Sequence, residues 1–382
     1  MPKIEEDLSI LGFGCMRFPL IENDITRIDE EKASEMLRYA IDNGVNYIDT
    51  AYPYHGTGTT EGGESEPFVG RVLADGYRDK VMLATKLPSW FIESRKDMDL
   101  YLEKQLLRLQ TDHIDFYLAH ALNSKYWKMY CSTGLTDFLD NAKEEGKIRY
   151  AGFSFHDDSM DLFKEIVDAY DWDFCQIQYN YLDENYQAGK EGLEYASSKG
   201  LGIIVMEPLK GGSLAVNMPP DASTVFKETN PARKPVDWAL NWIWNHNNVH
   251  VVLSGMSTID QIVENVKIAS HTDELRFSES ELNAVNRVKD IMNAKVQVAC
   301  TACGYCMPCP HGVDIPRNFL YYNNYHSFDD KSIRANSKIM YTSLLSEDQR
   351  ATSCVECGTC EPLCPQNIPI IEKLKNVAET MK

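Results

Sequence analysis

The sequence predicts an α/β protein in two parts. The first is a (β/α)8 barrel of the TIM type over residues 1–290, and the second is a small cysteine-rich domain over residues 291–382. From residue 8 onward, short apolar runs alternate with longer amphipathic ones. Strands that alternate with helices pair in parallel, and eight such units in about 250 residues can close a barrel. The second observation is that eight of the eleven cysteines lie beyond residue 299.

Each expected strand is a short apolar run. These runs cover residues 8–14, 45–50, 80–86, 113–120, 147–154, 173–180, 201–209 and 250–255. Each expected helix has apolar residues at three- and four-residue spacing, which places them on one face. These helices cover residues 31–43, 66–73, 97–109, 135–145, 160–169, 191–198, 235–245 and 258–269. Active sites of this fold lie at the carboxyl ends of the strands, so the residues that end each run are the first candidates.

The cysteines form two runs, each followed by a proline. They are Cys300, Cys303, Cys306 and Cys309, then Cys354, Cys357, Cys360 and Cys364. The second run has the spacing C-x2-C-x2-C-x3-C-P, which is the ligand pattern of bacterial [4Fe–4S] ferredoxins. The first run is one residue shorter in its last spacer. The tail therefore resembles a two-cluster ferredoxin domain, and the resemblance implies a ferredoxin-like fold with two [4Fe–4S] clusters.

In two-cluster ferredoxins, the fourth cysteine of each run binds the other cluster. By this resemblance, Cys364 completes the cluster of the first run, and Cys309 completes the cluster of the second. Two other interpretations remain. Structural disulfides would need an oxidising compartment, and the C-x2-C pairs of a zinc site usually lie roughly 15–20 residues apart. The spacing favours iron–sulfur clusters.

The composition excludes some classes of partner. The formal net charge is −19, which argues against nucleic acid, because proteins that bind it present a basic face. No apolar run approaches the roughly 20 residues needed to cross a bilayer, and the N-terminal stretch lacks the apolar core of a signal peptide. We therefore expect a cytoplasmic protein without a membrane partner.

Four polar residues stand at or just beyond strand ends: Asp49, Tyr54, Lys86 and His120. Each has an ordinary structural explanation. An aspartate there is often a helix cap, a tyrosine or lysine at a rim is usually solvated, and a histidine after an apolar run is often a core residue. Their position at strand ends of this fold raises the expectation that they are catalytic. The combination of an aspartate, a tyrosine, a lysine and a histidine raises that expectation further.

The four residues and their spacing resemble the aldo/keto reductase family over roughly residues 6–290. The motifs are Asp49-Thr-Ala-x-x-Tyr54, Thr85-Lys86, His120, and Gly146-Lys-Ile-Arg149-x-x-Gly152-x-Ser154. Reducing a carbonyl by hydride requires a positioned acid, and a lysine ammonium stabilises the phenolate of a neighbouring tyrosine. The resemblance implies that Tyr54 is the general acid/base, Lys86 tunes it, Asp49 pairs with the lysine, and His120 orients a small carbonyl or alcohol substrate.

The resemblance also implies a nicotinamide dinucleotide, NADP or NAD, across the barrel mouth. The expected contacts are Ser154 and Gln176 at the carboxamide, Pro208, Leu209, Lys210 and Gly211 at the pyrophosphate, and Glu264 and Asn265 at the adenine. Several positions depart from the family pattern. Met206 replaces the stacked aromatic residue, and Phe155 followed by His156 replaces an asparagine. Gly255 and Gln261 replace the cations that select NADP, so the choice between NADP and NAD stays open.

The two halves handle electrons differently, since a nicotinamide transfers a hydride and a cluster transfers one electron. A bound flavin or a redox partner protein could connect them, or the clusters could be structural. We expect an oxidoreductase in which the clusters relay electrons. The alternative is an electron-transfer or regulatory subunit that uses the barrel as a scaffold. The sequence does not indicate the substrate or the oligomeric state.

Overall fold

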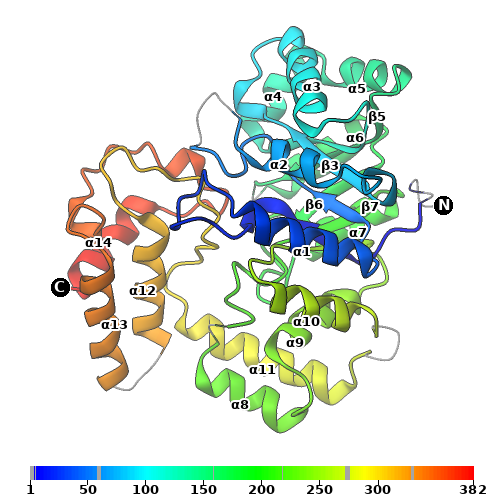
Figure 1. The fold of residues 1–382 in the computed structure, drawn as a ribbon. Helices are drawn as coiled ribbons and strands as arrows, with labels where there is room; N and C mark the ends of the chain where they lie inside the picture. Colours follow the sequence, from blue (N-terminus) through cyan, green and yellow to red (C-terminus); the bar gives the residue numbers. More distant parts are fainter. Residues whose placement is uncertain are drawn as a thin grey trace. The chain divides into compact units, whose positions relative to one another are not determined.

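The computed structural model describes residue 4 and residues 6–57, 62–157, 159–216, 218–271, 276–327 and 331–382. Residues 1–3 and 5, part of the N-terminal stretch discussed above, lie outside this set. Eight parallel strands close into a barrel in sequence order (Figure 1). They are β1 Leu11–Gly14, β2 Tyr47–Asp49, β3 Met82–Leu87, β4 Ile114–Leu122, β5 Ile148–Phe155, β6 Phe174–Gln178, β7 Gly202–Met206 and β8 Val251–Ser254. The predicted barrel is confirmed.

Large apolar side chains fill the barrel interior. The ring centroid of Phe116 lies 5.0 Å from that of Tyr47 and 5.0 Å from that of Phe174. Ile204 and Val251 belong to the same buried cluster. A barrel packed in this way is a core and not a pore, so its chemistry is confined to the mouth at the strand ends.

All eight predicted helices are present, with ends shifted by up to two residues. They are α1 Glu30–Asp42, α2 Ser65–Val72, α3 Arg95–Leu109, α5 Leu135–Glu144, α6 Met160–Ala169, α7 Gly189–Ser198, α9 Pro235–Trp244 and α10 Ile259–Ala269. Among the described residues up to residue 295, three further helices were not predicted: α4 Ser124–Thr133, α8 Pro220–Thr229 and α11 Glu279–Lys295. Short 3-10 helices occur at η1 Cys15–Arg17, η2 Arg78–Lys80, η3 Ser89–Phe91, η5 Ala351–Ser353 and η6 Glu361–Leu363.

Local chemistry explains several of these ends. The predicted strand at 201–209 stops at Met206, because Glu207 adopts a left-handed φ of 55° that breaks the extended backbone. A capping box between Ser278 and Glu281 begins α11, and this Ser-x-x-Glu pattern was visible in the sequence. Among the described helices, none is long and apolar enough to span a membrane.

By its internal contacts the chain divides into two units. One contains Met1–Pro208 and Leu240–Arg276, and the other contains Leu209–Ala239 and Phe277–Lys382. The second unit therefore includes α8 and α11 together with α12 Ile315–Ser327, α13 Lys331–Leu344 and α14 Ile370–Thr380. Its core includes Val313, Phe319, Leu374 and Val377, and cysteines of both runs pack against that core.

Candidate active site and cluster cavities

The carboxyl ends of β2, β3 and β4 bring the four predicted catalytic residues together. Asp49 ends β2, Tyr54 lies in the turn that follows, and Lys86 and His120 lie near the ends of β3 and β4. The Lys86 ammonium donates to both carboxylate oxygens of Asp49 at 2.7 Å, and to the Tyr54 hydroxyl at 3.4 Å. The ring centroids of Tyr54 and His120 lie 6.3 Å apart. The four side chains thus form one buried group.

Asp49 and Lys86 form a buried ion pair, in which the residues are 3% and 1% exposed. Burial raises the pKa of the Asp49 carboxyl and lowers the pKa of the Lys86 ammonium, and the attraction between the two opposes both shifts. The Thr50 carbonyl oxygen accepts a further hydrogen bond from Lys86 at 2.8 Å. The oxygen acceptors close to the Lys86 ammonium favour its charged form, and these contacts fix it beside Tyr54.

His120 is neutral near pH 7. Burial, the charge of Lys86 and the nearby His156 lower the pKa of His120 well below its usual range. A neutral imidazole offers one N–H donor and one acceptor nitrogen. The half-buried ring of Trp90 lies beside His120, with centroids 5.0 Å apart, so an aromatic wall borders the imidazole.

A second polar network supports the end of β3, which carries Lys86. The fully buried carboxylate of Glu66, in the first turn of α2, accepts hydrogen bonds from Thr85 at 2.7 Å and from Gln105 at 2.7 Å. Arg108 donates to the other Glu66 oxygen at 2.9 Å. Thr85 directly precedes Lys86 in β3, so this network positions the strand end that holds the ammonium.

The two residues expected at the carboxamide both lie on barrel strands. Ser154, in β5, accepts a hydrogen bond through its Oγ from the backbone N–H of Ala121 at 2.7 Å. Gln176, in β6, donates through its Nε2 to the Met206 sulfur at 3.5 Å. The Oε1 atom of Gln176 is buried, and no described residue supplies it with a hydrogen bond. An amide N–H of a bound ligand would satisfy that oxygen.

The residues expected at the adenine lie midway along α10. Asn265 is buried and donates to the Ser254 hydroxyl at 3.0 Å, and its neighbour Glu264 is half-buried. Gly255 follows β8, and a Cβ there would lie 3.0 Å from Cδ of Arg17. Arg17, which the sequence did not single out, therefore packs its side-chain carbons beside Gly255, and its guanidinium lies 3.9 Å from the Glu207 carboxylate.

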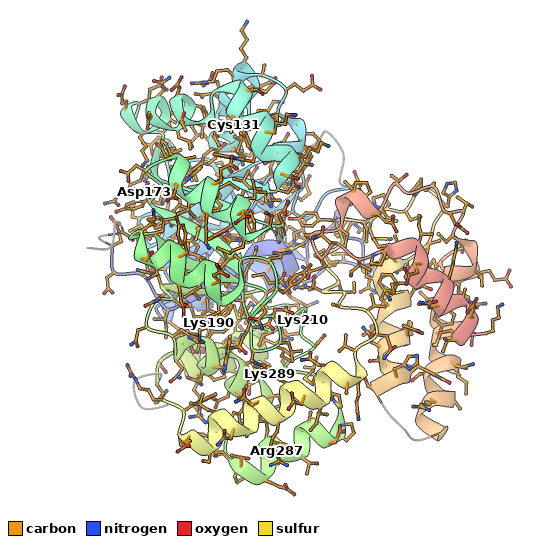
Figure 2. The ribbon with its side chains drawn as sticks, turned by 180° about the vertical axis from the view of Figure 1, so that it is seen from behind. Cys131, Asp173, Lys190, Lys210, Arg287 and Lys289 are labelled. Carbon is orange, nitrogen blue, oxygen red and sulfur yellow. The ribbon has the colours of Figure 1, made fainter. Side chains whose placement is uncertain are left out.

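The predicted pyrophosphate loop spans the boundary of the two units. Pro208 ends a segment of the first unit, and Leu209, Lys210 and Gly211 begin the second. Lys210, labelled in Figure 2, is 7% exposed and has a φ of 47°. Gly211 has a φ of +65°, and a Cβ there would collide with the Thr301 carbonyl oxygen. Only glycine fits this close approach to the loop of the first cysteine run.

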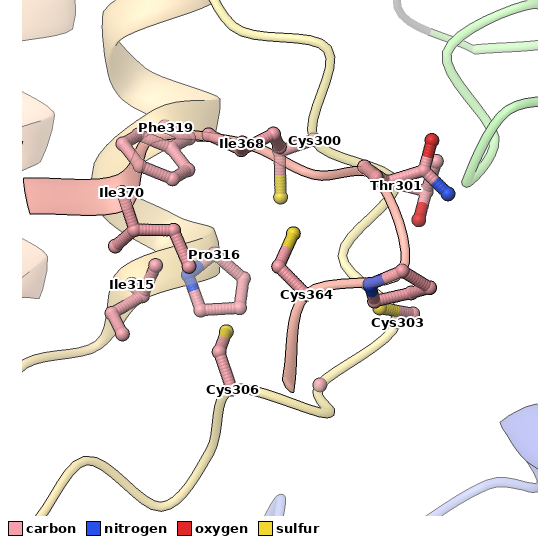
Figure 3. A pocket seen from close by; sticks show the side chains of 13 residues that line it. Cys300, Thr301, Cys303, Cys306, Ile315, Pro316, Phe319, Cys364, Ile368 and Ile370 are labelled. Carbon is pink, nitrogen blue, oxygen red and sulfur yellow. The ribbon is translucent and has the colours of Figure 1, made fainter. Parts of the chain in front are cut away.

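The eight clustered cysteines line two separate cavities in the second unit. One cavity contains Cys300, Cys303, Cys306 and Cys364, and the other contains Cys309, Cys354, Cys357 and Cys360. Each set therefore takes three cysteines from one run and the fourth from the other, as the ferredoxin resemblance implied. Figure 3 shows the sulfurs of Cys300, Cys306 and Cys364 directed toward one space.

The cavity walls suit a bulky sulfur-ligated group. Apolar side chains close the first cavity, including Phe319, Ile368 and Ile370. Ile315 lines both cavities. In the described residues, no three His, Cys, Asp or Glu side chains converge tightly enough for a single metal ion. Four thiols spread around an apolar cavity fit a [4Fe–4S] cluster, which Cys thiolates hold.

Two parts of the molecule match known protein families. Residues 10–290 match the aldo/keto reductase family, and residues 299–368 match a 4Fe-4S dicluster domain. Among curated relatives, L-galactose dehydrogenase from Arabidopsis thaliana is 26% identical over 300 residues, covering 74% of this chain and 90% of the relative. L-glyceraldehyde 3-phosphate reductase from Escherichia coli is 26% identical over 303 residues, covering 67% and 83%.

Solved structures show the same likeness. The holo form of aldo-keto reductase AKR11C1 from Bacillus halodurans is 26% identical, with a TM-score of 0.60, covering 74% of this chain and 92% of the other. An aldo/keto reductase from Klebsiella pneumoniae, in complex with NADP and acetate, is 22% identical, with a TM-score of 0.60 over the same shares. The likeness to the Klebsiella protein concerns the fold alone.

Proposed function

The chain belongs to the aldo/keto reductase family and carries a C-terminal 4Fe-4S dicluster domain, and from this premise we propose that it interconverts a small carbonyl compound and its alcohol with Tyr54 as general acid/base. The observation that carries this proposal is the buried Lys86 ammonium, 2.7 Å from both oxygens of Asp49 and 3.4 Å from the Tyr54 hydroxyl. A fixed positive charge beside a phenol stabilises the phenolate, which makes proton exchange easier.

In the direction of reduction, Tyr54 gives its hydroxyl proton to the carbonyl oxygen, and in oxidation it takes that proton back. Lys86 stabilises the phenolate that remains, and Asp49 holds Lys86 in place. Neutral His120 donates one N–H to the carbonyl oxygen and so orients it. A nicotinamide dinucleotide, when bound, supplies the hydride for the carbonyl carbon.

The residues at the mouth fit the carboxamide of such a cofactor. The buried and unpartnered Oε1 of Gln176 suits an amide N–H. Ser154 lies on the neighbouring strand, and Arg17 lies against Gly255. We expect NADP or NAD to bind here, and the dissociation constants of the two cofactors would show which one the protein prefers. Both curated relatives are named for hydroxylated aldehydes, so a hydroxylated carbonyl substrate is part of the proposal.

The clusters are proposed as an electron relay between the barrel and a redox partner protein. [4Fe–4S] clusters supply transfer of single electrons when bound, and two of them would together hold two electrons, which a bound flavin or the redox partner protein would have to combine with a proton before they could be passed on as one hydride. The close approach of Gly211 to Thr301 supports this role, because Thr301 lines the first cavity.

The test of the catalytic assignment is a Tyr54→Phe variant. We expect kcat for aldehyde reduction with NADPH or NADH to fall roughly 10²–10⁴-fold, because the acid is lost. Nicotinamide binding, followed by its fluorescence under anaerobic conditions, should be unchanged. If the variant retains wild-type kcat, Tyr54 is not the acid. If the wild-type protein binds neither dinucleotide, the scaffold alternative is favoured.

A further inference from the structure

We propose that the exposed wall of the second cysteine cavity is the surface at which a one-electron donor protein contacts this protein and that the first cavity is the inner one. This inference rests on the electron-relay part of the proposed function and adds the order in which the two cavities are used. Each uptake event oxidises one donor molecule by one electron and reduces one bound cluster by one electron, with no transfer of a proton.

The second cavity has an exposed wall. Five of the described residues that line it are exposed, and together they are called the electron-entry surface: Pro310, His311, Val355, Cys357 and Thr359. Cys357 is the only one of the eight clustered cysteines that is exposed. Electron transfer slows steeply as donor and acceptor move apart, so a cluster with a ligand at the surface is the one that a donor protein can reach.

The first cavity is enclosed. Of the described residues that line it, none is exposed. Thr301, in its wall, is 1% exposed, and the chain at Gly211 passes so close that a Cβ there would collide with the Thr301 carbonyl oxygen. Figure 3 shows Phe319 and Ile370 on another side of the same space. Because a shell of this kind controls access to a metal site, a donor protein is kept away from the first cavity.

The two cavities share part of their walls. Ile315 is 1% exposed and lines both of them. Cys306 and Cys309 are three residues apart in one run, yet they line different cavities. An electron taken up at the second cavity therefore has a short path to the first, which needs no exposed wall of its own.

The electron-entry surface offers a position where charge can be changed. Val355 is apolar, 58% exposed, and directly follows Cys354. The carboxylate of the next residue, Glu356, lies 2.8 Å from the Lys375 ammonium, which offsets its charge. A charge introduced at Val355 therefore changes the potential at this surface, and it attracts or repels a charged donor at low ionic strength.

The test compares Val355→Glu and Val355→Lys with Ala299→Glu and Ala299→Lys in the full-length, cluster-containing protein. Ala299 is exposed and directly precedes Cys300, so it is the matched control at the first cavity. The donors are reduced methyl viologen, which is a cation, and the sulfur dioxide radical anion that dithionite provides. Electron uptake is followed anaerobically by stopped flow, as bleaching of the viologen or, with dithionite, of the cluster absorbance.

We expect Val355→Glu to speed uptake from the viologen about threefold and to slow uptake from dithionite about threefold, as for unit charges roughly 7 Å apart in water. Val355→Lys should do the reverse, and both Ala299 variants should match the wild type. The effects should vanish in 1 M salt, where the Debye length is about 3 Å. A change in cluster potential would move both donors in the same direction, so opposite signs identify attraction at the point of entry.

Only variants with the iron and sulfide content of the wild type are compared. If a Val355 variant falls short, the same two substitutions at His311, which is exposed and lines the same cavity, take its place.

The proposal is overturned if the Ala299 variants change electron uptake as much as the Val355 variants, or if no variant changes it at low ionic strength. In both cases uptake by the wild-type protein leaves the relay itself standing. If the wild-type protein takes no electrons from either donor, the relay part of the proposed function fails and this inference fails with it, whereas the catalytic assignment of Tyr54 is unaffected.

Discussion

A single ammonium organises the candidate active site. Lys86 reaches Asp49, the Thr50 carbonyl and Tyr54, and it is almost fully buried. A buried ion pair contributes little net stability, but the loss of one partner leaves an uncompensated charge, which is costly. Lys86 therefore has two effects that can be measured separately, one on the chemistry and one on stability.

Replacing Lys86 by methionine should impair both properties. We expect kcat to fall roughly 10²–10⁴-fold, because Tyr54 loses its neighbouring charge. The free energy of unfolding should fall by about 3–5 kcal/mol, because the Asp49 carboxylate is left buried without a partner. Steady-state kinetics and urea unfolding followed by tryptophan fluorescence measure the two effects.

The control is the double variant Asp49→Asn with Lys86→Met, which removes both charges. It should recover much of the lost stability and none of the activity. An unchanged unfolding free energy in the single variant would mean that Asp49 does not depend on Lys86 for its charge.

At the residue scale, the sequence predicted Asp49, Tyr54, Lys86 and His120, and the structure brings them together. Strand-end position in a predicted barrel singled these residues out as candidates, and the resemblance to the aldo/keto reductase family implied their roles. The support from Glu66 was not foreseen, because its partners come from distant segments that meet only in the fold. His156 was noticed only as a departure from the family pattern.

At the scale of elements, each of the two cavities is lined by cysteines from both loops. Cys364 reaches the cavity of the first run and Cys309 reaches the cavity of the second. Because Ile315 lines both cavities, one side chain forms part of the wall on each side. The one-residue difference between the two last spacers does not prevent the exchange.

Paired serine variants test this assignment. Cys300→Ser with Cys364→Ser removes two ligands from the same cavity, so one cluster should be lost. Cys300→Ser with Cys309→Ser removes one ligand from each cavity, so both clusters should be lost. Iron and sulfide content per protein, measured anaerobically, gives the result. The reverse pattern would mean that each run holds its own cluster.

Helices were predicted where an apolar stripe was long and regular. The structure adds α4, α8 and α11 to those predicted for the barrel region. α8 has a proline in its first turn. Proline interrupts the interior of a helix but is favoured at a helix start, so the residue marks where α8 begins. The capping box of α11 was a usable signal that was overlooked. Ends of elements were less predictable, since positive φ values such as that of Glu207 depend on tertiary contacts.

For the molecule as a whole, the relay proposal predicts two activities that can be separated: aldehyde reduction driven by NADPH, and uptake of single electrons by the clusters. Five of the six tryptophans belong to the first unit, and Trp238 belongs to the second, so tryptophan fluorescence reports mainly on the first unit. The core around Phe319 and Leu374 packs against the cysteines, so it depends on what the cavities hold.

Removal of iron should therefore have selective effects. We expect loss of electron uptake from reduced methyl viologen, measured anaerobically as its bleaching, because without the clusters single electrons no longer enter the protein. Reduction driven by NADPH in excess should remain, and the unfolding midpoint reported by tryptophan should stay unchanged. Circular dichroism, which detects helices of both units, should show an additional transition at lower temperature.

Two outcomes would contradict the proposed separation of these two activities. If NADPH-driven reduction disappears with the iron, the clusters support the barrel structurally. If the wild-type protein cannot use the viologen at all, the clusters do not serve as a relay into the site.

The exchanged cysteines also have a consequence for biosynthesis. With this assignment, the first cluster lacks its last ligand until Cys364 has been translated, although its other three ligands emerge from the ribosome much earlier. A nascent chain that ends before Cys364 exposes three thiolates and an open apolar cavity. Cofactor insertion is thereby delayed until both loops exist, and a prematurely terminated product cannot complete the first cage.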